Sequence, residues 1–283
     1  MGWGMSGITG WDYVGTLNGD SGTYLGNGWV LTADHVTSGN VGTQNFTLDG
    51  TVYQTISGSD HFITYNYMGT TETADMDIFQ IAYGGSTGLT APALPNLPLS
   101  LNDPSSFLPT SVGDLTAMIG YGSPTNVKTW GLDTVTLTDQ LVGVYALVTN
   151  DFITANGTVT NGSANSTNNS GLYAGDSGGG DFIYNSATGR WELAGINEAI
   201  GNSNIDYNPA TGMWELSDTP GSGTTNIQNV DFSAMEQINS YATQISEITG
   251  IAVPEPSTWM LLGLGLASVW GFSRRRPSVS HRE

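Results

Sequence analysis

One serine of this chain stands in a setting typical of a nucleophile. Ser177, in the stretch GDSGGG, follows an aspartate and precedes three glycines and an apolar run. A serine hydroxyl is a weak nucleophile unless a base takes its proton, so a chemical role for Ser177 requires a histidine. Of the 3 histidines, His281 lies beyond a run of arginines at the C-terminus, and His61 is interpreted as a surface or loop histidine.

His35 is the candidate base. It follows two residues after a strand-like run that ends at Ala33, where a side chain leaves the sheet and reaches a cleft. Taken alone, a histidine in this position is more often packed in the core or in a turn than catalytic. An acid that orients such a histidine must be partly buried. Asp77, directly before the apolar run 78–81, is the predicted acid, and Asp75 is the second choice.

Short alternating or β-branched runs dominate the rest of the chain and predict strands. They flank residues 91–113, where five prolines prevent a regular strand or helix, so this segment is interpreted as a linker between two strand-rich halves. Residues 156–171 are small and polar and predict an exposed loop. The related stretches at 184–193 and 207–216 each predict a hairpin, the second as an insertion.

One helix is expected to close the globular part. Ser233 and Glu236 have the spacing of a capping box, and apolar residues follow at helical intervals. The pattern predicts a helix over residues 233–248.

Three stretches in order, VLTADHV, DIFQI and GDSGGG, resemble the trypsin-like (chymotrypsin-fold) serine endopeptidases. The resemblance runs from about residue 22 to 248 and includes GYG at 120–122. It implies an all-β fold within residues 1–250, with two six-stranded antiparallel β-barrels and a C-terminal helix. Barrel 1 would span about 8–90 and barrel 2 about 114–232, with the active site in the crevice between them.

The resemblance also implies roles for individual residues. Ser177 would attack the scissile carbonyl, His35 would shuttle the proton, and Asp77 would fix the histidine tautomer. The backbone N–H groups of Gly175 and Ser177 would form the oxyanion hole. The implied activity is hydrolysis of a polypeptide substrate through an acyl-enzyme. No cofactor is expected and no metal-binding motif occurs in the sequence, which leaves open calcium bound by scattered loop carboxylates. An inactive domain that binds a surface or matrix is the alternative.

The specificity pocket departs from the family pattern. Gly171 stands six residues before the serine, where an acid would favour lysine or arginine in the substrate. Glu198 and Ala199 stand where the family commonly has serine and tryptophan, and Gly201 completes the predicted lining. A carboxylate at position 198 would repel Asp77 or attract a basic substrate side chain, unless the alignment shifts by one residue.

Residues 251–283 resemble the PEP-CTERM sorting signal of Gram-negative bacteria. The signal has the motif VPEP at 253–256, an apolar run at 258–272 and a basic end at 273–283. The apolar run is shorter than the ~20 residues of most spanning helices. The resemblance implies a transient transmembrane helix in the inner membrane, cleavage by an exosortase, and sorting to the cell surface or extracellular matrix. A plain C-terminal membrane anchor is the alternative.

Charge and composition exclude other classes. Lys and Arg number 6 against 25 Asp and Glu, and only Lys128 and Arg190 are basic before residue 251, so nucleic acid is not an expected partner. The chain has no cysteine, which excludes disulfides and thiolate chemistry. Residues 1–15 lack the basic and apolar parts of a signal peptide. An upstream start is therefore expected, unless the C-terminal interpretation is wrong.

Overall fold

The structure is a computed structural model of the 283-residue chain. It describes residues 10–67, 69–82, 111–144, 147–156, 170–185, 189–208, 213–217 and 226–251. Most of the predicted linker, the polar loop at 157–169 and the sorting signal from 252 onward lie outside these residues. Within the described ranges, none of the helices has the length and apolar character of a membrane span.

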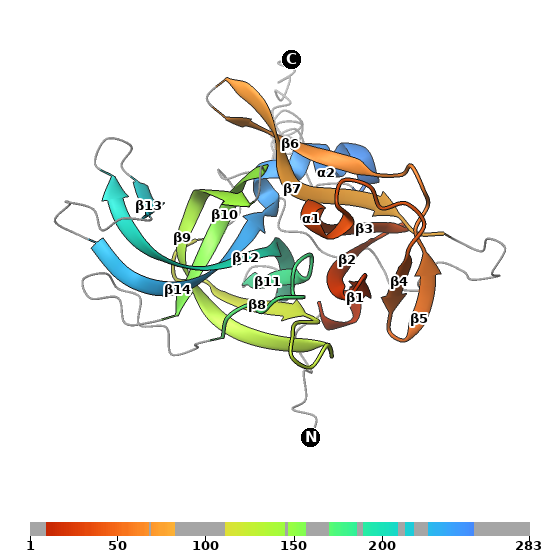
Figure 1. Ribbon diagram of the computed structural model, residues 1–283, viewed down its shortest axis with the longest axis horizontal. Helices are drawn as coiled ribbons and strands as arrows, with labels where there is room; N and C mark the ends of the chain where they lie inside the picture. The colour runs from red at the N-terminus through yellow and green to blue at the C-terminus, as the bar shows by residue number, and fades with distance from the viewer. Residues whose placement is uncertain are drawn as a thin grey trace, which may run out of the picture.

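The first half of the chain forms one antiparallel sheet of seven strands (Figure 1). The strands follow the order β5-β4-β1-β2-β3-β7-β6, and a bridge between Thr55 and Ile81 brings β5 to the end of β7. The elements of this half are η1 (Trp11–Tyr13), β1 (Val14–Leu17), β2 (Asp20–Gly26), β3 (Trp29–Ala33), α1 (Asp34–Thr37), β4 (Asn45–Leu48), β5 (Thr51–Gln54), β6 (His61–Tyr67) and β7 (Thr70–Gln80).

The second half forms another seven-stranded antiparallel sheet, in the order β11-β8-β9-β10-β14-β12-β13. Pairing of β11 with β12 closes six of these strands into a barrel, and β13 is added outside β12. Both predicted hairpins are present, and the second supplies the additional strand. The strands are β8 (Leu115–Gly120), β9 (Thr129–Val144), β10 (Leu147–Asn156), β11 (Gly180–Asn185), β12 (Arg190–Asn208), β13 (Met213–Ser217) and β14 (Asn226–Gln237). The all-β, two-barrel prediction is confirmed, with seven strands in each sheet rather than six.

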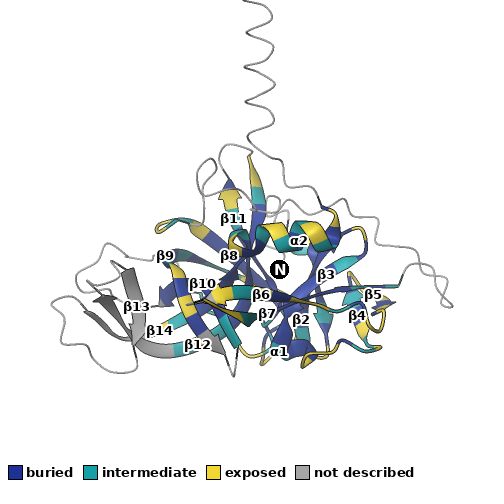
Figure 2. Cartoon of the chain, turned by 90° about the horizontal axis from the view of Figure 1, so that it is seen from above, coloured by how far each residue is buried: buried dark blue, intermediate teal, exposed yellow. Residues whose placement is uncertain are grey.

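Strand β7 is buried on both faces along residues 75–79 (Figure 2). One face carries Met76 and Ile78 into the core of the first barrel. The other carries Asp75 and Asp77, because alternate residues of a strand share a face. Strand β10 of the second barrel contacts β7, so these carboxylates lie where the two barrels meet.

The predicted helix begins nine residues later than expected. Ser233 and Glu236 belong to β14, which pairs with β10 on one side and β12 on the other, so the capping-box prediction is wrong. Two full ladders of hydrogen bonds outweigh a local capping signal. The chain then continues as η2 (Ile238–Tyr241) and α2 (Ala242–Thr249). From α2, the Gln244 amide donates to the Thr64 carbonyl of β6 at 2.7 Å, which fastens the end of the domain to the first barrel.

Candidate functional site

The loop that carries Ser177 is hydrogen-bonded to strand β2 of the first barrel. The Ser21 N–H donates to the Ser177 carbonyl at 2.9 Å, and the Ser21 hydroxyl donates to the Gly175 carbonyl at 2.9 Å. Thr23 Oγ1 donates to the Gly178 carbonyl at 3.2 Å. Because β2 pairs with β3, whose end leads directly into α1 and His35, the serine loop and the histidine are attached to neighbouring strands.

His35 is held by Asp75. Its ring Nδ1 lies 2.5 Å from Asp75 Oδ2, and its backbone N–H donates to Asp75 Oδ1 at 2.7 Å. Two contacts from one carboxylate fix both the position of the residue and the orientation of its ring. They also place the proton on Nδ1, which leaves Nε2 as the basic nitrogen.

The prediction that Asp77 orients His35 is wrong, and the second choice, Asp75, makes the contact. Asp77 Oδ2 instead accepts a hydrogen bond from Thr37 Oγ1 at 2.9 Å. Burial raises the pKa of Asp77 to about 7, although the Thr37 hydrogen bond opposes the shift. A half-protonated carboxyl at neutral pH would be a poor electrostatic partner for an imidazolium.

Strand register decides between the two acids. Asp77 pairs with Thr32 and Met76 with Ala33, the last residue of β3. Asp75 precedes Met76 on β7. It therefore lies beyond the last paired residue of β3, at the level where α1 begins. Both acids share a face, but only Asp75 lies level with the turn that carries His35.

The surroundings of His35 favour its charged form. Burial alone lowers the pKa of the imidazole. The hydrogen bond and charge of Asp75, with the charges of Asp20 and Asp34, outweigh burial and raise the pKa above its ordinary value. A raised pKa makes the neutral ring a stronger base. It also means that the ring becomes neutral only at a higher pH.

Ser177 is half-buried, and its hydroxyl donates a long hydrogen bond of 3.4 Å to the Glu198 carbonyl. Gly178 next to it has φ of +79° and turns the chain sharply. A Cβ there would overlap with Thr32 Oγ1 and the Ser21 carbonyl, so only glycine fits against β2 and β3.

The predicted oxyanion donors lie in the same loop. Gly175 has φ of +98°, in the region that glycine tolerates best. Among the hydrogen bonds of the described residues, none is donated by the N–H of Gly175 or Ser177.

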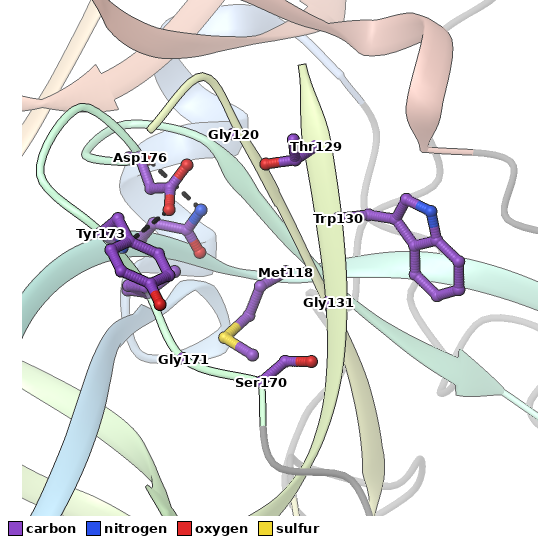
Figure 3. Close-up of a pocket in the computed structure, with 11 residues that line it drawn as sticks. Met118, Gly120, Thr129, Trp130, Gly131, Ser170, Gly171, Tyr173 and Asp176 are labelled. Carbon is purple, nitrogen blue, oxygen red and sulfur yellow. Dashed lines mark hydrogen bonds between the residues drawn. The ribbon is translucent and has the colours of Figure 1, made fainter. Parts of the chain in front are cut away.

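Asp176, between these two residues in the sequence, lines a pocket of the second barrel together with Gly120 and Tyr173 (Figure 3). Its Oδ1 accepts a hydrogen bond from Gly122 N–H at 2.7 Å, and its Oδ2 accepts one from Tyr173 N–H at 2.8 Å. Burial raises the pKa of Asp176, and these two hydrogen bonds oppose the shift. A side chain at Gly120 would overlap with this carboxylate, which gives a physical reason for a glycine there.

A cavity of ≈ 480 Å³ opens beside the serine loop. It is lined by Gly171, Leu172, Tyr173, Ile200, Gly201, Asp231, Phe232 and Ser233. Of the predicted pocket residues, Gly171 and Gly201 are in this lining, whereas Ala199 and Glu198 are not. The Glu198 side chain is 4% exposed and accepts a hydrogen bond from Thr149 Oγ1 at 2.7 Å. Sequence reasoning missed Asp231, because no motif marks the strand that carries it.

Of the other histidines, His61 is exposed at the start of β6, with its ring 5.7 Å from that of Trp29. Its interpretation as a surface residue is confirmed, although it lies in a strand rather than a loop. His281 lies outside the described residues.

Two family models match the sequence. Residues 6–217 match the trypsin family, and residues 252–276 match the PEP-CTERM protein-sorting motif. The chain therefore belongs to the trypsin family and carries a sorting motif at its C-terminus. That motif implies export, surface sorting and a sorting-system partner in general. No curated protein matches the sequence.

A search of solved structures finds similar chains at low sequence identity. Rv3671c from M. tuberculosis H37Rv, in an inactive form, matches with a TM-score of 0.48 at 11% identity. The match covers 86% of this chain and 90% of the Rv3671c chain. The HtrA-type protease AlgW with a tripeptide has a TM-score of 0.46 at 17% identity and covers 84% of this chain. The matched region is 60% of that AlgW chain.

Proposed function

We propose that the protein is a serine endopeptidase whose triad is Ser177, His35 and Asp75. The observation that carries the proposal is the 2.5 Å contact between His35 Nδ1 and Asp75 Oδ2, at the end of β3, the strand that pairs with β2, to which the serine loop is hydrogen-bonded. In this triad Asp75 takes the role that the sequence had suggested for Asp77.

Each proposed step uses a group with suitable surroundings. His35 Nε2 takes the proton of the Ser177 hydroxyl as the oxygen attacks the scissile carbonyl, and Asp75 stabilises the imidazolium. The N–H groups of Gly175 and Ser177 donate to the oxyanion. The histidine then protonates the leaving amine, and water hydrolyses the acyl-enzyme by the same route.

The cavity beside the serine loop is proposed to receive the substrate side chain that precedes the scissile bond. Asp231 is the one lining residue with an acidic side chain, which favours a basic substrate group there. A peptide-library cleavage profile should show enrichment of lysine or arginine, and Asp231→Asn should reduce it. An unchanged profile in the variant would exclude Asp231 as the determinant.

A fluorophosphonate probe tests the nucleophile. The probe should label the full-length wild-type protein, and Ser177→Ala should abolish labelling. Ser246→Ala, in α2 and remote from the loop, is the matched control and should label as the wild type does. Labelling that survives Ser177→Ala would place the nucleophile elsewhere, and no labelling of the wild type would favour an inactive, binding domain.

The sorting motif supports a proposal about location. The protein is proposed to be exported, held transiently in the inner membrane through residues 258–272, and cleaved by an exosortase for release at the surface or into the matrix. Replacing Pro254, Glu255 and Pro256 by alanine in a host with an exosortase should leave uncleaved, membrane-associated protein. Secretion unchanged from that of the wild type would reject this route.

A further inference from the structure

Four buried carboxyl groups gather at Asp75. A carboxylate oxygen of Asp75, one of Glu198 and one of Glu236 all lie within 4.8 Å of one another. Asp151 lies against Glu198 and is opposite Glu236 in the pairing of β10 with β14. The four side chains come from β7, β10, β12 and β14, so both barrels contribute to the cluster.

Most of the oxygens in this cluster have no hydrogen-bond donor. Both oxygens of Glu236 and Oε2 of Glu198 are buried and accept no hydrogen bond from the described residues. Asp151 has Thr149 and Glu198 beside it, but neither of its oxygens has a donor in full hydrogen-bonding geometry. Asp151 and Glu236 are 0% exposed. A buried carboxylate oxygen without a partner loses its hydration and gains nothing in return, which is strongly unfavourable unless a proton or a cation binds it.

No lysine or arginine neutralises these groups within the described ranges. Before residue 251 the chain has only two lysines or arginines. Lys128 Nζ donates to the Trp11 carbonyl at 2.9 Å, and Arg190 is exposed on the β11–β12 hairpin. Among the residues that the structure describes, only His35 brings a positive charge near the cluster, through its contact with Asp75.

We infer that the cluster is a binding site for one divalent cation of the Ca²⁺ type, with Asp151, Glu198 and Glu236 as ligands and Asp75 as the ligand that joins the ion to His35. Ca²⁺ binds oxygens at 2.3–2.6 Å, so two ligand oxygens on opposite sides lie about 5 Å apart, which fits the spacing here. Carboxylates that bind through one or two oxygens supply the 6–8 contacts that Ca²⁺ takes.

Other cations fit the donor set less well. Mg²⁺ requires shorter bonds of about 2.0–2.1 Å and usually keeps several waters, whereas this cluster is enclosed by protein. Zn²⁺ prefers nitrogen and sulfur ligands, which the cluster lacks. A bound Ca²⁺ would offset the repulsion among the carboxylates and hold Asp75 in place against the histidine.

Metal binding is tested on the full chain without substrate, so the result does not depend on whether the protein hydrolyses peptides. Protein freed of metal with EDTA and then dialysed is titrated with CaCl₂ by calorimetry, and its thermal unfolding is followed with and without CaCl₂. One tight site per chain and a higher Tm with Ca²⁺ are expected, with a smaller effect of MgCl₂. The Ser177→Ala protein should behave in the same way, which separates this site from the nucleophile.

Two substitutions that change the net charge equally distinguish binding at this site from non-specific attraction of cations to an acidic chain. Glu236→Gln should abolish the stoichiometric site and the Tm shift, whereas Glu247→Gln, exposed on α2, should keep both. Circular dichroism in EDTA checks that the first variant folds, and Glu198→Gln replaces it if it does not. Two results would overturn the inference. In the first, the wild type has the same Tm in EDTA and in CaCl₂ and shows no stoichiometric binding. In the second, both variants bind Ca²⁺ equally well. The first result would mean that protons alone neutralise the cluster.

Discussion

The backbone N–H of Ser21 donates to the carbonyl oxygen of Ser177 at 2.9 Å and joins the two barrels at the centre of the site. The carbonyl of Ser21 in turn accepts a hydrogen bond from Thr32 Oγ1 at 2.8 Å, three residues before His35. Two hydrogen bonds through one residue of β2 therefore set the position of the serine loop relative to the strand that leads to the histidine. Ser21 is 0% exposed, so water does not compete for these bonds.

The two acids on β7 should differ sharply in their effect on catalysis. Asp75→Asn keeps the shape of the side chain but favours the wrong histidine tautomer, so kcat should fall by about 10⁴-fold, as in the general serine–histidine–aspartate template. Asp77→Asn should lower kcat by less than about tenfold, because its carboxyl contacts Thr37 rather than His35. Steady-state kinetics on a peptide substrate measure both effects.

Fluorophosphonate labelling rates provide a second measurement on the same pair, because they report on the reactivity of Ser177 without substrate binding. The Asp75 variant should be labelled much more slowly than the Asp77 variant. The reverse order would return the orienting role to Asp77.

Gly178→Ala should destabilise the fold by roughly 2–5 kcal/mol. About 1–2 kcal/mol comes from forcing a side chain into the left-handed region, and the rest comes from overlap with Thr32 Oγ1 and the Ser21 carbonyl. Gly58→Ala is the matched control, because Gly58 has φ of +77° but no atom within 4 Å of the added Cβ. Urea unfolding of both variants should show the larger loss at Gly178, and equal losses would mean that the serine loop yields easily.

Asp181 should make the protein less stable as pH rises. Burial raises the pKa of this carboxyl from 3.8 to about 7, against the effect of its hydrogen bond from Thr116, and the nearby charge of Asp133 adds to the shift. Between these two values the folded state holds a proton that the unfolded state has lost. The contribution to stability is therefore complete below about pH 4 and decreases by about 1.4 kcal/mol per pH unit until about pH 7.

Asp181→Asn removes this titration. Its Tm relative to the wild type should increase between pH 4 and pH 8, as measured by thermal unfolding across that range. Parallel Tm curves for the two proteins would show that Asp181 ionises in the folded state as easily as in the unfolded one.

Local sequence signals failed where strands from distant parts of the chain decided the outcome. Ser233 and Glu236 satisfy a helix-capping rule that depends only on their spacing, but β14 has a partner strand on each side. The buried carboxylates show the same limit. Asp151 and Glu236 occur in unremarkable runs, and only the pairing of β10 with β14 brings them to Glu198 and Asp75.

The sequence by itself determined the residue types and their order: a histidine at the end of a strand, an acid before an apolar run and a serine among glycines, in two strand-rich halves. These features depend on local chemistry, since turns, strands and the preference for glycine are properties of short segments. The tertiary structure decided which acid contacts His35, because Asp75 and Asp77 share a face and differ only in their level along β7. That level follows from the register of β3 against β7, which many contacts across the barrel fix together.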